Sequence, residues 1–201
     1  MTTMTPSEVK TTTQGQIDKA VANYRALLEK RAPEFESAAV QTVLGQPEFA
    51  EAQFALFRER VESASEIIIR RVKVDRSRSR QKVIDATGRK QYIDKDVLAT
   101  MPTGEGDKVD VWFVPTKRHI PAAEVPAFLA RYGLVPDPRA QAAVNKADPA
   151  FADKVPNGTQ WGDNCCLAFG RWNDERRVRC DRFDYGWYDD WFLCGVPASR
   201  K

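Results

Sequence analysis

The sequence has no long apolar run and almost no histidine. No stretch approaches the ~18 consecutive apolar residues that a membrane-crossing helix needs. The first residues, MTTMTPSEVK, lack the charged and then apolar pattern of a secretory signal peptide. We therefore expect a soluble cytoplasmic protein without a membrane partner. The single histidine, His119, leaves little material for a histidine-based triad or metal site.

The four cysteines lack the spacing of a zinc site. Cys165 and Cys166 are adjacent, and Cys180 and Cys194 stand alone, so no C-x-x-C pair is present. Adjacent cysteines in a strand also point to opposite faces. A chain of 201 residues does not need disulfides for stability, so we expect reduced thiols in a core. We predict no metal and no cofactor.

A large excess of one charge is also absent, since the formal net charge is only +3. That balance is too small to indicate nucleic-acid binding. Its distribution is uneven, however. Residues 1–65 carry seven basic and nine acidic groups, whereas residues 66–90 carry nine basic and three acidic groups. Nearly all of the imbalance therefore lies in one short stretch.

The first third of the chain has the patterns of helices. Residues 1–13 are Thr-rich and without periodicity, so we expect a disordered tail. Apolar residues recur at helical spacing from Gln14, with Thr13 as N-cap and Pro33 as a stop. A second helix is predicted over about 34–44, closed by Gly45, and a third after Pro47 to about residue 65. Residues 14–65 should thus form a helical hairpin or small bundle.

After residue 66 the pattern becomes mixed. We predict a first strand at 67–74 and the clearest middle strand at 109–114. Residues 82–85 are too short a pattern to separate strand from helix. The remaining predicted helices are at 94–100, 121–132, 138–146 and 149–153, and a Pro-Asn-Gly turn at 156–158 leads to Trp161.

The stretch from Trp161 to Pro197 holds four of the five tryptophans and all four cysteines. Three strand-like runs lie within it, at 165–172, 176–183 and 191–196, and we interpret them as a three-stranded antiparallel meander. Val178 and Cys180 should face the core. The fold class is therefore α+β: a helical region at 14–65, then a mixed domain at 66–201 that ends in an aromatic-rich meander.

The basic stretch after the first strand is the main candidate binding site. Interleaved with Ser77 and Ser79, its cations could contact successive phosphates of a nucleic acid. The alternative is a solvated, mobile loop whose charge keeps a strand edge from pairing with other chains. The predicted nucleic-acid-binding residues are Arg70, Arg71, Lys73, Arg76, Arg78, Arg80 and Lys82.

Two other candidate sites lie in the meander. Trp187 and Tyr188 occupy a turn between acidic residues, so they are the candidates for an exposed patch that binds a partner, although packing over the end of the meander is favoured for both. The same region carries four carboxylates, which could serve a metal-assisted enzyme or simply act as turn residues. These are Asp181, Asp184, Asp189 and Asp190.

Several segments carry a resemblance to known sequences. These are DATGRKQYIDKDVLATMPTGEGD, DPAFADKVPNGTQW and the terminal WFLCGVP. They resemble segments of uncharacterised bacterial proteins associated with phage and other mobile elements. The resemblance covers about half of the chain and carries no catalytic motif. It implies a setting and no activity.

These observations favour a non-enzymatic cytosolic binding protein that docks electrostatically on a nucleic acid or an acidic protein surface. The N-terminal helices would mediate assembly, including a homo-oligomer, or contact with a partner. Three alternatives stay open: a protein-binding or inhibitor module that uses the aromatic meander, a carboxylate or metal-assisted enzyme, and a structural component of a virion.

Overall fold

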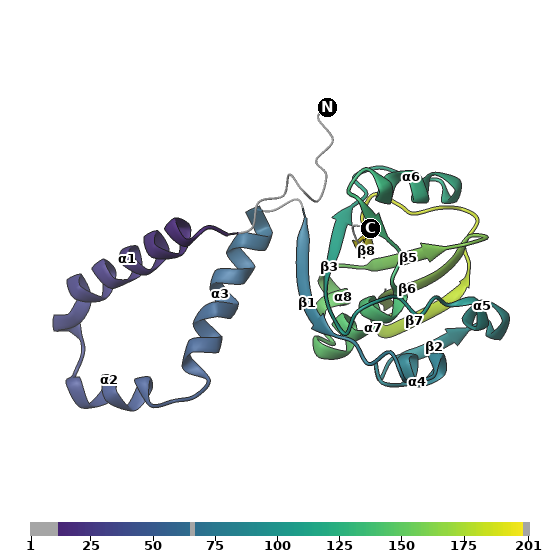
Figure 1. The fold of residues 1–201 in the computed structure, drawn as a ribbon. Helices are drawn as coiled ribbons and strands as arrows, with labels where there is room; N and C mark the ends of the chain where they lie inside the picture. The colour runs from purple at the N-terminus through teal and green to yellow at the C-terminus, as the bar shows by residue number, and fades with distance from the viewer. Residues whose placement is uncertain (1–11, 65–66, 199–201) are drawn as a thin grey trace. The chain divides into compact units, whose positions relative to one another are not determined.

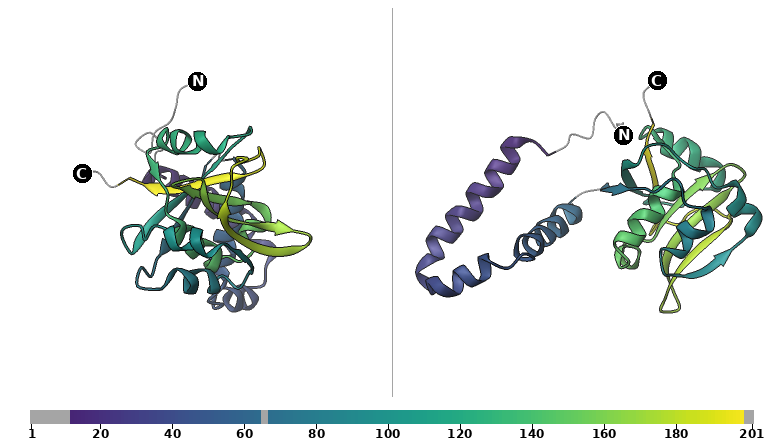
Figure 2. Two further views of the ribbon diagram at one scale, coloured as in Figure 1. Left: turned by 90° about the vertical axis from the view of Figure 1, so that its right-hand side faces the viewer. Right: turned by 60° about the horizontal axis from the view of Figure 1, so that its bottom comes forward.

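The computed structural model describes residues 12–64 and 67–198. Within these ranges the chain divides into two compact units, a helical one and a mixed one. Figures 1 and 2 show both units.

The helical unit follows the local signals of the sequence. Thr13 caps the first helix, and its side chain and that of Gln16 form a reciprocal capping box. Pro33 lies in a short 3-10 turn that separates the first two helices, and Gly45 closes the second helix as predicted. The elements are α1 (Gln14–Arg31), η1 (Ala32–Glu34), α2 (Ser37–Leu44) and α3 (Phe49–Ala64).

A packed hairpin or bundle is not confirmed for these helices. No residue between 12 and 58 is buried. The apolar stripes of α1 and α3 are about half exposed instead, as Tyr24 and Phe54 illustrate at 45% and 50%. Contact between α1 and α3 includes a hydrogen bond from the Gln53 amide to the Tyr24 hydroxyl.

The mixed unit is an α+β domain built on one mixed sheet of eight strands. The strands are β1 (Ile68–Lys73), β2 (Lys90–Ile93), β3 (Lys108–Pro115), β4 (Leu134–Val135), β5 (Asn157–Trp161), β6 (Cys165–Trp172), β7 (Glu175–Arg182) and β8 (Phe192–Pro197). The helices are α4 (Arg80–Asp85), α5 (Lys95–Thr100), η2 (Ala122–Glu124), α6 (Val125–Ala130), α7 (Pro138–Ala147) and α8 (Phe151–Lys154).

The strand order is β1-β3-β8-β5-β6-β7-β2, with β4 paired to β8 at the side. β6 and β7 form the predicted antiparallel hairpin, with Leu167 opposite Cys180. The third strand of the predicted meander, β8, does not lie beside β7. β8 lies between β3 and β5, antiparallel to β3 and parallel to β5, so the three-stranded meander is not confirmed.

The two faces of the sheet are covered in different ways. Leu167, Phe169 and Val178 point to the face that α4, α5, α7 and α8 cover, where they form the larger core. The segment with η2 and α6 lies on the opposite face, where the Gln160 amide donates to the carbonyl of Ala122. In Figure 1, α6 is drawn above the sheet, and α4 and α5 are drawn below it.

The structure decides one segment that the sequence left open, corrects one predicted turn and adds two short strands. Residues 82–85, which the pattern left undecided, complete α4, because the Ser79 hydroxyl accepts from the Lys82 amide and caps the helix. The predicted turn at 156–158 is wrong, since Asn157 and Gly158 begin β5. The short strands β2 and β4 were not predicted, because two to four residues carry too little periodicity.

Candidate functional site

The basic stretch runs from β1 through a tight loop into α4. Asp75 organises the loop, since its carboxylate accepts from the Ser77 amide at 3.1 Å and the Ser77 hydroxyl at 2.6 Å. These hydrogen bonds, with a smaller contribution from Arg78, lower the pKa of Asp75. The loop therefore has a defined conformation before any ligand binds.

Arg76, one of the predicted phosphate contacts, is an internal anchor. Its guanidinium donates to both carboxylate oxygens of Asp137, at 2.8 and 2.7 Å. Its remaining donors are bonded to the carbonyls of Thr103, Glu105 and Gly106. An arginine has five N–H donors, and all five of Arg76 are used inside the protein. Arg76 therefore has no donor left for a phosphate.

Arg80 and Arg139 stabilise the same region through hydrogen bonds from their guanidinium groups to backbone carbonyls. Arg80 Nε donates to the carbonyl of Met101 at 2.8 Å. Arg139 Nη1 donates to the carbonyls of Arg76 and Arg78, both at 2.8 Å. Burial, with the nearby charges of Arg80 and Arg76, lowers the pKa of Arg139. Arg139 was missed in the sequence, because nothing local distinguishes it from a surface helix residue.

The other five residues of the basic stretch do not anchor the loop from inside the fold. Arg78 is 41% exposed at its side chain and pairs with Asp75 at 3.1 Å, and Lys82 is exposed on the first turn of α4. Lys73 is exposed at the end of β1. Arg71 forms two 2.8 Å hydrogen bonds with Asp110, and the Arg70 guanidinium lies 4.9 Å from the centre of the Phe151 ring.

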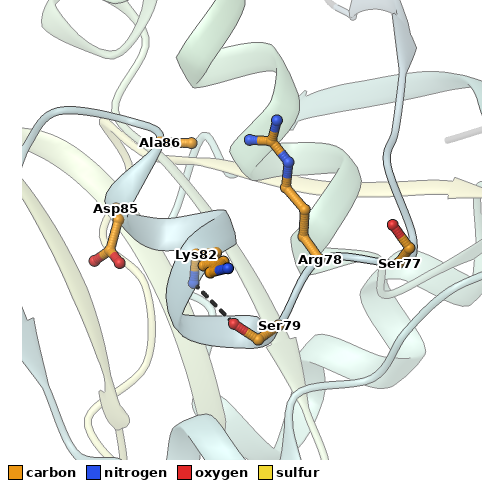
Figure 3. Close-up of a pocket in the computed structure, with 6 residues that line it drawn as sticks. All are labelled: Ser77, Arg78, Ser79, Lys82, Asp85 and Ala86. Carbon is orange, nitrogen blue, oxygen red and sulfur yellow. Dashed lines mark hydrogen bonds between the residues drawn. The ribbon is translucent and has the colours of Figure 1, made fainter.

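An open hollow lies where the loop meets α4. Figure 3 shows that its lining comes from consecutive parts of the loop and helix. The lining residues are Ser77, Arg78, Ser79, Lys82, Asp85 and Ala86. The Asp85 carboxylate accepts from the side chains of Gln81 and Gln91, at 2.8 and 3.0 Å. The hollow therefore offers two hydroxyls and two cations, with one carboxylate among them.

The two residues predicted as an aromatic patch are placed differently. Trp187 is 1% exposed, so it packs over the end of the meander and its candidate place in an exposed patch is wrong. Its Nε1 donates to Gln160 Oε1 at 3.0 Å, and its ring packs on Gly158, which leaves no room for a Cβ there. Tyr188 is 58% exposed. His119 lies beside it and hydrogen-bonds through Nε2 to the carbonyl of Tyr185 at 2.8 Å.

Two of the four predicted carboxylates, Asp181 of β7 and Asp184 of the following loop, have separate partners. Asp181 pairs with Arg179 and accepts from the Cys166 thiol at 3.6 Å. Asp184 accepts from the Asn164 amide at 2.9 Å. Within residues 12–64 and 67–198, no group of three or more His, Cys, Asp or Glu side chains is placed to hold a metal ion.

All four cysteines are buried free thiols. Burial, with the negative charge of Asp181, raises the pKa of Cys180 to about 12. Burial is also the main cause that raises the pKa of Cys166 and of Cys194. These three groups are therefore protonated thiols at neutral pH, and a thiol is a far weaker nucleophile than a thiolate.

Neither a protein-family model nor a curated protein nor a solved structure gives a significant match to this chain. Among the helices of the described ranges, none has the length and apolar character that crossing a membrane requires.

Proposed function

We propose that this chain is a non-enzymatic binding protein whose mixed unit docks electrostatically on nucleic acid. The contact surface is the outward part of the basic stretch, formed by Lys73, Ser77, Arg78, Ser79 and Lys82. The resemblance of its segments to phage-associated proteins suggests a phage or mobile-element setting.

The observation that carries this proposal is the anchored loop beside the hollow. Arg76 and Arg139 fix the loop backbone from inside the fold, so Arg78 and Lys82 are presented from a rigid support. A preorganised surface loses less conformational entropy on binding than a mobile loop would. The internal arginines therefore support the outer cations without contacting the ligand.

The local charge favours an anion. Seven basic residues lie between positions 70 and 82. Asp75 in the stretch, and Asp110 and Asp137 from other elements, neutralise three of them. Asp75 is the one acidic residue within positions 70–82, so basic residues are in excess there. Such an excess on a small area raises the local concentration of a polyanion and its rate of association.

The chemistry of the lining favours nucleic acid over an acidic protein face. Protein interfaces depend on a few buried aromatic or apolar anchors. The hollow is lined by serines, one arginine, one lysine and one aspartate, with Ala86 as its only apolar residue. Phosphate contacts require only cations, hydroxyls and amides. We therefore expect contacts to the backbone and little sequence preference.

The test is binding of the full chain to single- and double-stranded oligonucleotides at several salt concentrations. Because Arg76 and Arg80 are internal, we expect about three phosphates to be contacted, with a log–log salt slope of about −2.7 on duplex. The variant Arg78→Ala/Lys82→Ala should lose most of the binding at moderate salt and keep the fold.

A matched control removes the same charge elsewhere. Lys95→Ala/Arg131→Ala changes two other exposed cations of the mixed unit. It should bind nearly as the unmodified chain does. Equal losses in both variants would show a nonspecific charge effect, and no binding at low salt would reject the proposal.

An acidic protein surface is the other outcome of this experiment. It would give no oligonucleotide binding and a weak salt slope with the protein partner. Binding to that partner would then be weakened by Tyr188→Ala, because Tyr188 is the exposed member of the predicted aromatic pair.

A further inference from the structure

We propose that the apolar faces of α1 and α3 are covered by a second copy of this chain, in an antiparallel four-helix arrangement. This inference concerns the helical unit and does not depend on nucleic-acid binding. Its basis is an apolar surface that the described part of the chain leaves exposed. The two helices concerned are drawn in purple and blue in Figure 1.

The exposed apolar surface of the helical unit is large. Thirteen large apolar side chains are between 38% and 68% exposed. They are Ile17, Val21, Tyr24, Leu27, Leu28, Phe35, Val40, Val43, Leu44, Phe54, Leu56, Phe57 and Val61. Apolar patches of this extent on soluble proteins mark interaction surfaces. Helices of 8 to 18 residues are also marginal in water unless such a face is packed.

The spacing of these residues fits helix-to-helix packing. In α1, the seam is Ile17, Val21, Tyr24 and Leu28. In α3, it is Ala50, Phe54, Phe57 and Val61. Both seams follow the alternating three- and four-residue spacing of coiled coils and four-helix bundles. They span the same number of residues, so one α1 seam matches one α3 seam over its full length.

A contact within one chain indicates the register of this match. The Gln53 amide donates to the Tyr24 hydroxyl, so Tyr24 lies beside the residue that precedes Phe54. In an antiparallel alignment that pairs Tyr24 with Phe54, Val21 lies opposite Phe57, Ile17 opposite Val61, and Leu28 opposite Ala50. Every seam residue of one helix therefore meets a seam residue of the other.

The same register brings opposite charges together at both ends. Lys30 is aligned with Glu48, and Asp18 with Arg60. As a whole, α1 carries four basic and two acidic residues, whereas α3 carries two basic and three acidic residues. α2 has no charged residue. The charge of α1 is thus complementary to that of α3, which favours pairing of α1 with α3 over pairing of identical helices.

A second copy would cover more of the apolar side chains of these two seams than the single chain does. Despite the contact at Tyr24, Val21 is 62% exposed and Phe57 is 52% exposed. A twofold axis would place α1 of each copy against α3 of the other, so the same contact is made twice and the assembly closes at two copies. The four helices then enclose one shared apolar core.

The experiment is the mass of the full chain, measured by sedimentation or light scattering over a wide range of concentration. We expect twice the mass of one chain, dissociating on dilution. Phe57→Asp places a carboxylate in the seam and should shift the dissociation constant by at least tenfold. Its control is Ala55→Asp, which adds the same charge at an exposed position outside the seam and should leave the mass unchanged.

A charge exchange tests the register and is independent of any loss of fold in the seam variant. Lys30→Glu places like charges together and should weaken the dimer, whereas Lys30→Glu/Glu48→Lys should restore it. A single-chain mass at all concentrations would show that the helices close on themselves and would overturn the proposal. Equal effects of Phe57→Asp and Ala55→Asp, or no restoration by the charge exchange, would also overturn it.

Discussion

At the scale of single residues, Asp137 connects two parts of the mixed unit. Its carboxylate is fully buried and pairs with Arg76, and it also accepts from the Ala140 amide at the start of α7. Gly104 packs so closely on this pair that an added Cβ would lie 2.5 Å from an Asp137 oxygen. A sequence pattern suggests only the helix cap, since Asp137 precedes Pro138. Its larger role is to anchor the basic loop.

We predict that Asp137→Asn destabilises the mixed unit by about 3–5 kcal/mol, because it leaves the largely buried Arg76 charge without its partner. Urea unfolding measures this change. Asp75→Asn is the matched control, since it alters an exposed arginine pair in the same loop and should cost much less. Similar costs for the two variants would contradict the anchoring role of Asp137.

At the scale of elements, the last loop of the chain closes one face of the sheet. The segment between β7 and β8 returns over β5, and Trp187 hydrogen-bonds with Ile120 through both backbone groups at 2.8 Å. The Trp187 ring also packs edge-to-face with Phe183 and Trp191, at centroid distances of 5.3 and 5.1 Å. This packing makes the aromatic cluster part of the core.

Gly158→Ala should therefore destabilise the fold by about 1–3 kcal/mol, the usual cost of overpacking. An added Cβ at this position would lie 2.0 Å from the Trp187 ring, which must move. Thermal unfolding and the near-UV tryptophan signal both report the change. Gly170→Ala in the neighbouring strand is the comparison, since its nearest atom would be 3.2 Å away and should require a smaller adjustment. Equal effects would contradict the close packing of Trp187 on Gly158.

At the scale of the whole molecule, ion pairs connect elements that are distant in the chain. Arg176 of β7 lowers the pKa of Asp153 in α8, Lys90 of β2 and Arg177 lower that of Glu175, and Arg71 of β1 lowers that of Asp110. A carboxyl with a lowered folded pKa stabilises the fold above its unfolded pKa. That stabilisation is lost as the pH falls through the folded pKa.

Stability of the mixed unit should accordingly be greatest near neutral pH and decline below about pH 4, where unfolded carboxyls bind protons. Urea midpoints between about pH 7 and about pH 3 measure this dependence. Asp153→Asn should reduce stability near neutral pH and make the acid decline shallower. A decline that is unchanged in this variant would exclude the Asp153 pair as a contributor.

Local features of the chain were sufficient to predict most helices and the hairpin of β6 and β7. The N-cap Thr13, the closing Gly45 and the Asp137-Pro138 pair act within one helical turn, so their effect is visible in a short stretch. The alternation of Val178 and Cys180 likewise correctly predicted which side chains of β7 are buried. The basic stretch was visible for the same reason, as a run of adjacent charges.

Contacts between residues that are distant in the sequence determined the features that local patterns did not predict. Arg76 and Asp137 are 61 positions apart, and no local pattern separates an arginine that anchors a loop from one that faces solvent. The position of β8 between β3 and β5 depends on which backbone edges meet in space, and the same composition would have suited a place beside β7. Trp187 is buried for a similar reason, because Gly158, distant in sequence, leaves room for its ring. Residue type and spacing determine the elements, whereas pairing across the fold determines which charges and aromatic rings remain at the surface.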